Sequence, residues 1–294
     1  MPEQKVFDPA AYSFPRFEYA HYFRGLWRER GAKAIYKQFQ KHLRRPISRR
    51  IVSDFSHAST NMEVQGSRGA RGPSAREATN MEVQGSRGAR GPSAREPHGF
   101  GLEIGVGART IAPVSRTLLA DGYESHGRDR SIAQVYFPAA AIPFVAESFD
   151  FVLSEHTLEH IGNVLRALRE WIRVLKPGGH LILFLPHKER TNDRLRERTT
   201  LAHLIDDEKR EVPDDDTTHV DEWIANVTRA GGIPEHYRHI AKDELARTGS
   251  IHHHVWIAAD IKEVFEYLGL RVVYLSEQVA DRSDSFVVVG EKQS

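Results

Sequence analysis

Apolar and polar positions follow one pattern before about residue 98 and another after it. From there on, short apolar runs alternate with segments whose apolar residues recur at helical spacing. Strands are predicted at 100–105, 149–153, 181–185, 271–275 and 285–290, and helices at 110–120, 163–175 and 257–268. The run 181–185 is apolar on both faces, as in a central strand of a parallel sheet. This alternation predicts a doubly wound, Rossmann-like α/β sheet, and the polar turn 281–284 lets the last two strands pair antiparallel.

The first 97 residues lack this alternation. Residues 1–55 carry twelve Lys and Arg residues against five acidic ones, with aromatic and aliphatic residues at helical spacing. We interpret them as a helical arm whose second helix ends before Pro46 and whose basic, aromatic face suits peripheral contact with an anionic membrane surface. We interpret residues 56–97 as a disordered linker. Within it, 60–77 and 79–96 are identical tandem copies with too few apolar residues to build a solenoid.

Composition narrows the chemistry without identifying it. The 294 residues include 41 Lys and Arg against 40 Asp and Glu, so the chain as a whole is not the basic body expected of a nucleic-acid-binding protein. The absence of cysteine excludes disulfides, thiolate zinc sites and a cysteine nucleophile. With no apolar leader and no stretch of about 18 apolar residues, the sequence predicts a cytoplasmic protein without a transmembrane segment.

The most informative segment follows the first strand after the linker. Glu103 lies two positions before Gly105-Val106-Gly107, where bare backbone N–H groups lie open to a ligand carboxylate or phosphate. Further motifs follow in order at 127–131, 142–144, 148–152, 154–160 and 175–179. The ordered series resembles the class I S-adenosylmethionine-dependent methyltransferases. Within them it is most similar to the small-molecule group, methyltransferase type 11, that includes the ubiquinone-biosynthesis methyltransferases.

The resemblance implies S-adenosylmethionine as the cofactor and assigns its binding residues by position. Glu103 and the glycine turn would hold the methionine end of the cofactor. Asp129 would end the second strand and accept hydrogen bonds from both ribose hydroxyls. Residues 154–156, at the end of a later strand, would line the reactive side of the cofactor. The residues so implied are Glu103, Ile104, Gly105, Val106, Gly107, Asp129, Ser154, Glu155 and His156.

The chain departs from the family pattern at three places. Arg109 replaces the family's third glycine, which places a side chain near the cofactor. Only a dozen residues separate Asp129 from Ile142, so the helix after the second strand is expected to be absent and the third strand, near 134–137, to be short. Pro138 replaces the acid that commonly binds the adenine amino group. A nicotinamide-binding Rossmann domain is the rival interpretation, but its fingerprint requires glycine where this chain has Thr110.

Residues 187–256 form a long insertion within a methyltransferase domain that we place at 98–294. The insertion follows the fifth family strand, where this fold receives its substrate, and it contains eight of the sixteen histidines. A histidine there suits removal of a proton from an acceptor hydroxyl, and the candidate bases are His187 and His219. Candidate substrate residues are Arg194, Arg198, His252, His253 and His254.

A metal site is the alternative interpretation of the same histidines. Asp214, Asp216 or His219 would join the run 252–254 around a divalent ion. Because no pair has the i, i+4 spacing of a motif such as H-E-x-x-H, no metal ligand is assigned.

The function predicted from these features is methyl transfer to a small polar acceptor, with O-methylation of a sugar or related metabolite as the specific hypothesis. Two alternatives stay open. One is a catalytically silent module that binds S-adenosylmethionine. The other is an RNA or nucleobase methyltransferase that uses the basic arm. The Asn-Pro-Pro-Tyr type of motif for amino-group methylation is replaced by Ser154-Glu155-His156, so nucleic acid is not expected as a partner.

Overall fold

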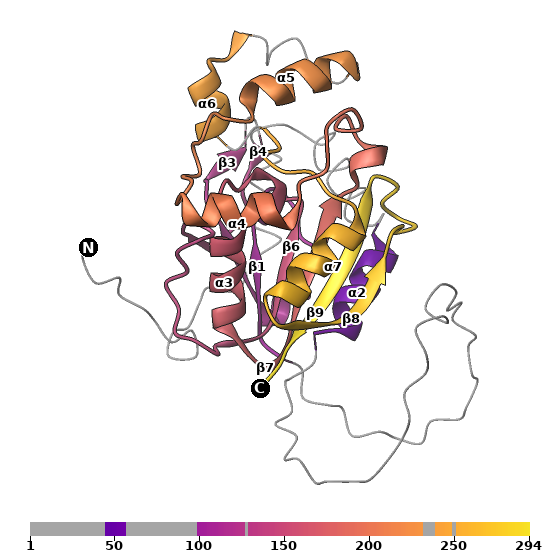
Figure 1. Cartoon of the computed structure of the whole chain (residues 1–294). Helices are drawn as coiled ribbons and strands as arrows, with labels where there is room; N and C mark the ends of the chain where they lie inside the picture. Colours follow the sequence, from indigo (N-terminus) through magenta and orange to yellow (C-terminus); the bar gives the residue numbers. More distant parts are fainter. Residues whose placement is uncertain (1–44, 57–98, 127–128, 232–238, 249–250) are drawn as a thin grey trace, which may run out of the picture.

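The computed structural model describes residues 45–56, 99–126, 129–231, 239–248 and 251–294 (Figure 1). A seven-stranded sheet with the order β5-β2-β1-β6-β7-β9-β8 lies at its centre. These strands are β1 (Gly101–Ile104), β2 (Thr117–Asp121), β5 (Val135–Tyr136), β6 (Phe149–Glu155), β7 (Leu175–Pro186), β8 (Leu270–Ser276) and β9 (Ser285–Lys292). No helix among the described residues is long and apolar enough to cross a membrane. The proposed arm up to residue 44 and the tandem copies lie outside the described residues.

Strand direction confirms the predicted sheet. Strands β5, β2, β1, β6 and β7 pair parallel with one another in that order. Strand β9 pairs antiparallel with β7, and β8 pairs antiparallel with β9, as expected for the C-terminal hairpin. The chain builds outward from β1 through β2 to β5 and then crosses to β6 on the other side of β1. The order of the sheet therefore reverses between β1 and β6, which is where ligands bind in open α/β sheets.

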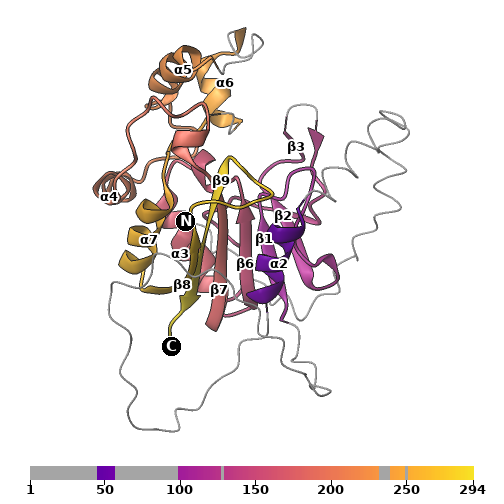
Figure 2. The same cartoon turned by 90° about the vertical axis from the view of Figure 1, so that its right-hand side faces the viewer.

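Helices cover both faces of the sheet (Figure 2). One face is covered by α3 (Val164–Val174), α4 (Leu201–Lys209) and α7 (Ala258–Tyr267), whose buried residues share one core with Leu181, Leu183 and Leu185 of β7. The other face carries α2 (Pro46–Asp54), and Ile182 and Phe184 belong to the core on that side. Successive residues of β7 thus point to opposite cores, which explains why the run is apolar throughout.

Helix α2 is fastened to the loop between β8 and β9. Pro46 is its first residue, where the missing N–H of proline does no harm. The Asp281 carboxylate accepts hydrogen bonds from the backbone N–H groups of Ile47 and Ser48, at 2.9 and 3.1 Å, and from the Ser48 hydroxyl at 2.6 Å. A residue 233 positions away therefore caps this helix.

The predicted helix at 110–120 is wrong. Val114–Arg116 forms only a single 3-10 turn, η2, and the following residues form strand β2. Pro113 accounts for the error, because proline lacks the N–H of a helical hydrogen bond and disfavours helical geometry at the residue before it. The second strand therefore ends at Asp121, so the expectation that Asp129 ends it is wrong as well. Asp129 instead begins β4 (Asp129–Arg130), which pairs with β3 (Ser125–His126) outside the main sheet.

The region between β2 and β6 is reduced, as the spacing predicts. Among its described residues there is no α-helix, and the third parallel strand, β5, has only two residues. After β6, the 3-10 turn η3 (Leu158–His160) leads to α3, whose first turn is capped by Asn163 through a 3.1 Å hydrogen bond from the Arg166 N–H.

The insertion after β7 covers part of one face of the sheet and extends beyond its end (Figures 1 and 2). It contains η4 (Lys188–Arg190), α4, α5 (Val220–Arg229) and α6 (Lys242–Arg247). Helix α4 contacts α3 and α7, whereas α5 and α6 pack on each other around Val220, Trp223 and Leu245. Figures 1 and 2 both show α5 and α6 apart from the two layers that flank the sheet.

Candidate functional site

The glycine turn follows β1 at the point where the strand order reverses. Gly105 and Gly107 have φ values of +73° and +54°, which L side chains rarely adopt. A Cβ at Gly105 would lie 2.0 Å from the Thr157 hydroxyl oxygen, so this glycine also allows the chain after β6 to approach. A Cβ at Gly107 would have no neighbour within 4 Å, so the turn has open space beside it.

Asp121, at the end of β2, holds this turn. Its Oδ2 accepts from the Gly107 N–H and from the Ser131 hydroxyl, both at 2.9 Å. Its Oδ1 accepts from the Gly122 and Tyr123 N–H groups at 2.8 and 3.3 Å. A carboxylate can accept about four hydrogen bonds, so these four contacts within the protein use the capacity of Asp121. The sequence interpretation missed this residue because the strand that ends in it was taken for a helix.

Glu103 points inward from β1 instead of toward the turn. Its carboxylate is 1% exposed and accepts a hydrogen bond from the Thr110 hydroxyl, whose oxygen in turn accepts from the Ala112 N–H at 2.8 Å. Burial raises the pKa of Glu103 well above its ordinary value, although the Thr110 hydrogen bond opposes the change. Glu103 thus holds the segment after the turn in place through Thr110.

This buried acid makes stability depend on pH in a stated direction. The pKa of Glu103 in the folded state lies above the unfolded value of 4.5. Its contribution to the free energy of unfolding is therefore complete below pH 4.5. Between that pH and the folded pKa, the free energy of unfolding falls by about 1.4 kcal/mol per pH unit. Glu103→Gln keeps the acceptor for Thr110 and removes the titration. We expect the melting temperature of the variant minus that of the wild type to grow between pH 5 and pH 8. The same difference measured with Glu263→Gln, an exposed acid on α7, should stay flat, and a flat Glu103→Gln difference would contradict the assignment.

Glu155 ends β6, beside the glycine turn, and is paired with two arginines. Arg109 Nη2 lies 3.3 Å from Glu155 Oε1, and the fully buried Arg282 also contacts this oxygen. Burial alone would raise the pKa of Glu155, but the charges of Arg282 and Arg109 outweigh it and lower the pKa. Oε2 of Glu155 is buried and has no hydrogen-bond partner among the described residues. The carboxylate is therefore ionised, with one oxygen available to a donor.

Ser154 and His156, on either side of Glu155, are held by hydrogen bonds of their side chains. The Ser154 hydroxyl donates to the Ile104 carbonyl at 3.1 Å, which ties β6 to β1 beneath the turn. His156 has a φ of +52°, an uncommon value for a residue with a side chain, and its Nε2 lies 2.7 Å from the Ser285 hydroxyl. Burial lowers the pKa of His156 to about 4, so its imidazole is neutral at neutral pH. Val106, next to the turn, packs with Leu119.

The histidine run of the insertion lies against the segment that follows β6. The His253 N–H donates to the Glu159 carbonyl at 2.7 Å, and His160 Nδ1 lies 2.8 Å from the Ile251 carbonyl. The Glu159 side chain is completely buried, and burial raises its pKa to about 7. The rings of His160 and His252 meet edge to face with centroids 4.9 Å apart. None of the residues at 158–160 was among the site residues predicted from the sequence.

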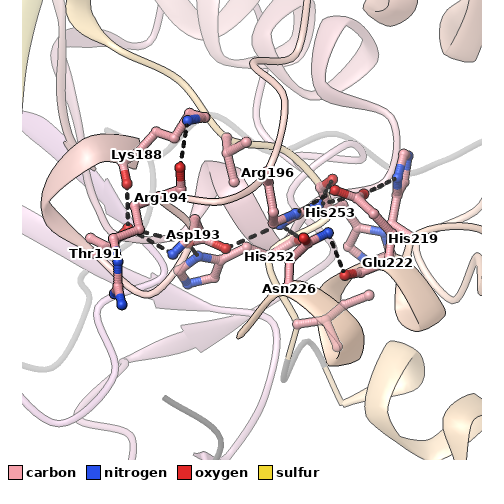
Figure 3. A network of polar contacts seen from close by, with 12 residues as sticks. Lys188, Thr191, Asp193, Arg194, Arg196, His219, Glu222, Asn226, His252 and His253 are labelled. Atoms are coloured by element: carbon pink, nitrogen blue, oxygen red, sulfur yellow. Dashed lines mark hydrogen bonds and ion pairs between the residues drawn. The ribbon is translucent and has the colours of Figure 1, made fainter. Parts of the chain in front are cut away.

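His252 is held by a buried carboxylate (Figure 3). Its Nδ1 lies 2.6 Å from Asp193 Oδ2, and the Arg196 guanidinium is 3.2 Å from the other oxygen of Asp193. Arg196 also donates to the carbonyls of His252 and His253, at 2.7 and 3.1 Å, and to Glu222 at 3.0 Å. Burial alone would lower the pKa of His252, but the hydrogen bond and charge of Asp193 raise it. The His252 side chain is 24% exposed while Asp193 is 3% exposed, so the ring is accessible and its partner is not.

The other predicted residues lie elsewhere. His187 Nδ1 accepts from the Glu189 N–H and its Nε2 lies 3.1 Å from Glu277, so both ring nitrogens have partners. Arg194 donates to the Ala230 carbonyl, and Arg198 lies 3.3 Å from Asp260 at the start of α7. These three residues do not join the histidine run. Arg196, two positions from each arginine candidate, is the one that does.

His219, the second candidate base, directly precedes α5 and contacts the histidine run. Its ring contacts those of His254 and His203, with centroids 5.5 and 5.2 Å apart. The side chain of Asp129 lies outside what the structure describes, so its predicted role at the ribose stays a prediction.

Comparison with known proteins agrees with the motifs. Residues 112–183 match the family model of a methyltransferase domain. Over 62 residues the chain is 37% identical to demethylmenaquinone methyltransferase of Mycobacterium sp. (strain KMS), and over 87 residues it is 34% identical to the ubiquinone/menaquinone biosynthesis C-methyltransferase of Hahella chejuensis. These matches cover 21% and 26% of this chain, and they span only 27% and 35% of the two relatives.

A solved structure of an S-adenosylmethionine-dependent methyltransferase from Thermotoga maritima is 20% identical, with a TM-score of 0.40 over 67% of this chain and 84% of that one. The family match and the curated relatives confirm the resemblance drawn from the motifs.

Proposed function

We propose that this chain, which carries a class I S-adenosylmethionine-dependent methyltransferase domain, transfers a methyl group to a small polar acceptor bound beneath its insertion. The observation that carries the proposal is the meeting of the glycine turn after β1 with Glu155 after β6. Beside Gly107 there is open space, and Glu155 Oε2 is a buried acceptor without a partner among the described residues.

The residues of this meeting point fit the methionine end of the cofactor. Glu155 Oε2 suits its ammonium group, and Arg109, partly exposed and steadied by Glu155, suits its carboxylate. The open space where a side chain of residue 107 would lie suits close approach of the cofactor. When bound, the cofactor supplies a sulfonium whose methyl group is already activated toward nucleophiles. The protein's part is then to align the acceptor, exclude water and receive a proton.

The His252–Asp193 pair is our candidate for receiving that proton. A base held by a buried third group has a fixed orientation and one nitrogen free for the substrate. Nδ1 of His252 is hydrogen-bonded to Asp193, so Nε2 is the nitrogen that would face a substrate. The ring contacts His160, in the segment that follows β6. His187 and His219 are the alternatives inferred from the sequence, but His187 has partners on both nitrogens.

Binding of S-adenosylmethionine is the first test, measured by isothermal titration calorimetry on the full chain. We expect the wild type to bind and Glu155→Gln to bind at least about tenfold more weakly, because a charge-assisted hydrogen bond contributes about 1.5–3 kcal/mol. Glu277→Gln, an exposed acid after β8, serves as the matched control and should bind like the wild type. Asp129→Ala tests the ribose assignment in the same experiment. Absence of binding by the wild type would overturn the proposal.

The acceptor class is decided by labelling. Histidines, Arg196 and buried carboxylates favour a polar acceptor, and we propose O-methylation of a sugar or related metabolite. The curated relatives act on quinone precursors by their names, which makes C-methylation of a quinol the second candidate. Transfer of labelled methyl to a panel of nucleotide sugars, small phenols and demethylated quinols separates the two. Labelling of quinols alone would defeat the sugar hypothesis.

A further inference from the structure

We infer that His203, His219 and His254 bind one divalent transition-metal ion of the zinc class inside the insertion. Each offers one imidazole nitrogen, and these three nitrogens lie within 4.8 Å of one another. The residues come from three segments: His203 from α4, His219 from the start of α5, and His254 from the run before α7. Three neutral imidazoles at this spacing are a common ligand set for zinc and related ions.

A buried carboxylate lies beside the three rings. Asp207 is on α4 at i, i+4 from His203, so both side chains lie on the same face of that helix. Its Oδ2 is 3.1 Å from His203 Nε2 and 3.8 Å from His254 Nε2, while its Oδ1 accepts from Arg210 at 2.8 Å. The Asp207 side chain is 3% exposed. Its negative charge would offset that of a bound cation.

Several polar atoms of this group lack hydrogen-bond partners in the described structure. They are His203 Nε2, Asp207 Oδ2 and His254 Nδ1, all buried, and the first two face each other as an ion pair at 3.1 Å without making a hydrogen bond. Buried polar atoms that make no hydrogen bond destabilise the folded state, and here three of them lie in one place. A bound cation would satisfy such atoms together.

The opposite nitrogens of two rings are held as in known metal sites. His254 Nε2 lies 3.1 Å from the Gly162 carbonyl, and His219 Nδ1 lies 3.5 Å from Glu222. A carbonyl or carboxylate on the outer nitrogen of a histidine fixes its tautomer and turns the other nitrogen toward a metal. The arrangement therefore aims one nitrogen of each of these rings at a ligand.

Sequence inspection missed His203 because it looked for paired histidines at helical spacing, whereas the helical pair is His203 with Asp207. Of the residues in the alternative metal interpretation, His219 and His254 join the group. His219 is then a metal ligand and not the base predicted from the sequence.

The experiment uses the full chain after removal of bound metal with a chelator. Titration with Zn²⁺ is expected to show one ion per chain and to raise the melting temperature, since a ligand that binds only the folded state stabilises it. Co²⁺ is expected to give the visible absorption of a four-coordinate or five-coordinate ion with nitrogen ligands.

Variants decide where the ion sits. His203→Gln and His219→Gln, both at partly exposed positions, should weaken Zn²⁺ binding by more than about 100-fold, and Asp207→Asn by about 10–100-fold. His239→Gln, exposed in the same insertion, is the control and should bind like the wild type. No stoichiometric binding, or binding unchanged in His203→Gln and His219→Gln, overturns the inference. Loss in His160→Gln alone also overturns it, because the ion would then lie in the neighbouring group of Glu159, His160 and His252.

Discussion

His252→Gln is expected to lower the rate of methyl transfer to a hydroxyl acceptor by about 10²–10⁴-fold, the range over which a positioned base acts. Glutamine keeps much of the size of the ring but cannot take up a proton. The 2.6 Å contact with Asp193 orients the ring, and its 24% exposed side chain can reach a substrate. Affinity for S-adenosylmethionine should be unchanged, because we assign the residue to the acceptor and not to the cofactor. Turnover and cofactor binding are measured on the same preparations.

Asp193→Asn should lower turnover less than His252→Gln, since it acts through the ring, and combining both changes should add little. His239→Gln should have wild-type turnover. A His252→Gln enzyme that melts like the wild type and methylates at the wild-type rate would refute the assignment. If His252→Gln does not fold, Asp193→Asn still tests the pair, because a merely structural role would change melting and not kcat alone.

Arg282→Met is expected to lower the free energy of unfolding by about 3–5 kcal/mol, measured by urea denaturation. Arg282 is fully buried, contacts Glu155, and lies over the ring of Phe184 with its charge 5.2 Å from the centroid. Its Nε also donates to the Ser48 hydroxyl of α2 at 3.1 Å. Removing it leaves the partly exposed Arg109 as the arginine paired with Glu155 among the described residues, and it loosens the helix on that face.

The matched control is Arg271→Met, which breaks an exposed ion pair with Glu291 and should change stability by no more than about 1 kcal/mol. Adding Glu155→Gln to Arg282→Met should recover part of the loss, because the carboxylate no longer needs a counter-charge. Equal losses in the Arg282 and Arg271 variants would show that the buried pair is not important for stability.

The sheet and the glycine turn after its first strand could be predicted from local sequence. The apolar runs at 149–153 and 181–185 became β6 and β7, because these strands bury side chains on both faces of the sheet. The two glycines after β1 account for the turn that follows that strand. The reduced region after β2 followed from residue counting alone. The same local reasoning failed at 110–120, because apolar spacing cannot distinguish a short strand from a helix, and Pro113 was given too little weight.

The partners of these local elements were decided only by the tertiary structure. Asp281 caps α2 across 233 positions, Asp193 meets His252 across 59, and Arg282 reaches Glu155 from the loop after β8. Such pairs leave no periodic signal, because they depend on which loops the sheet order brings to one edge. The sequence by itself thus determined the class of domain and where its glycine turn lies. Which histidines meet, and which carboxylates orient them, depended on packing of the insertion against the end of β6.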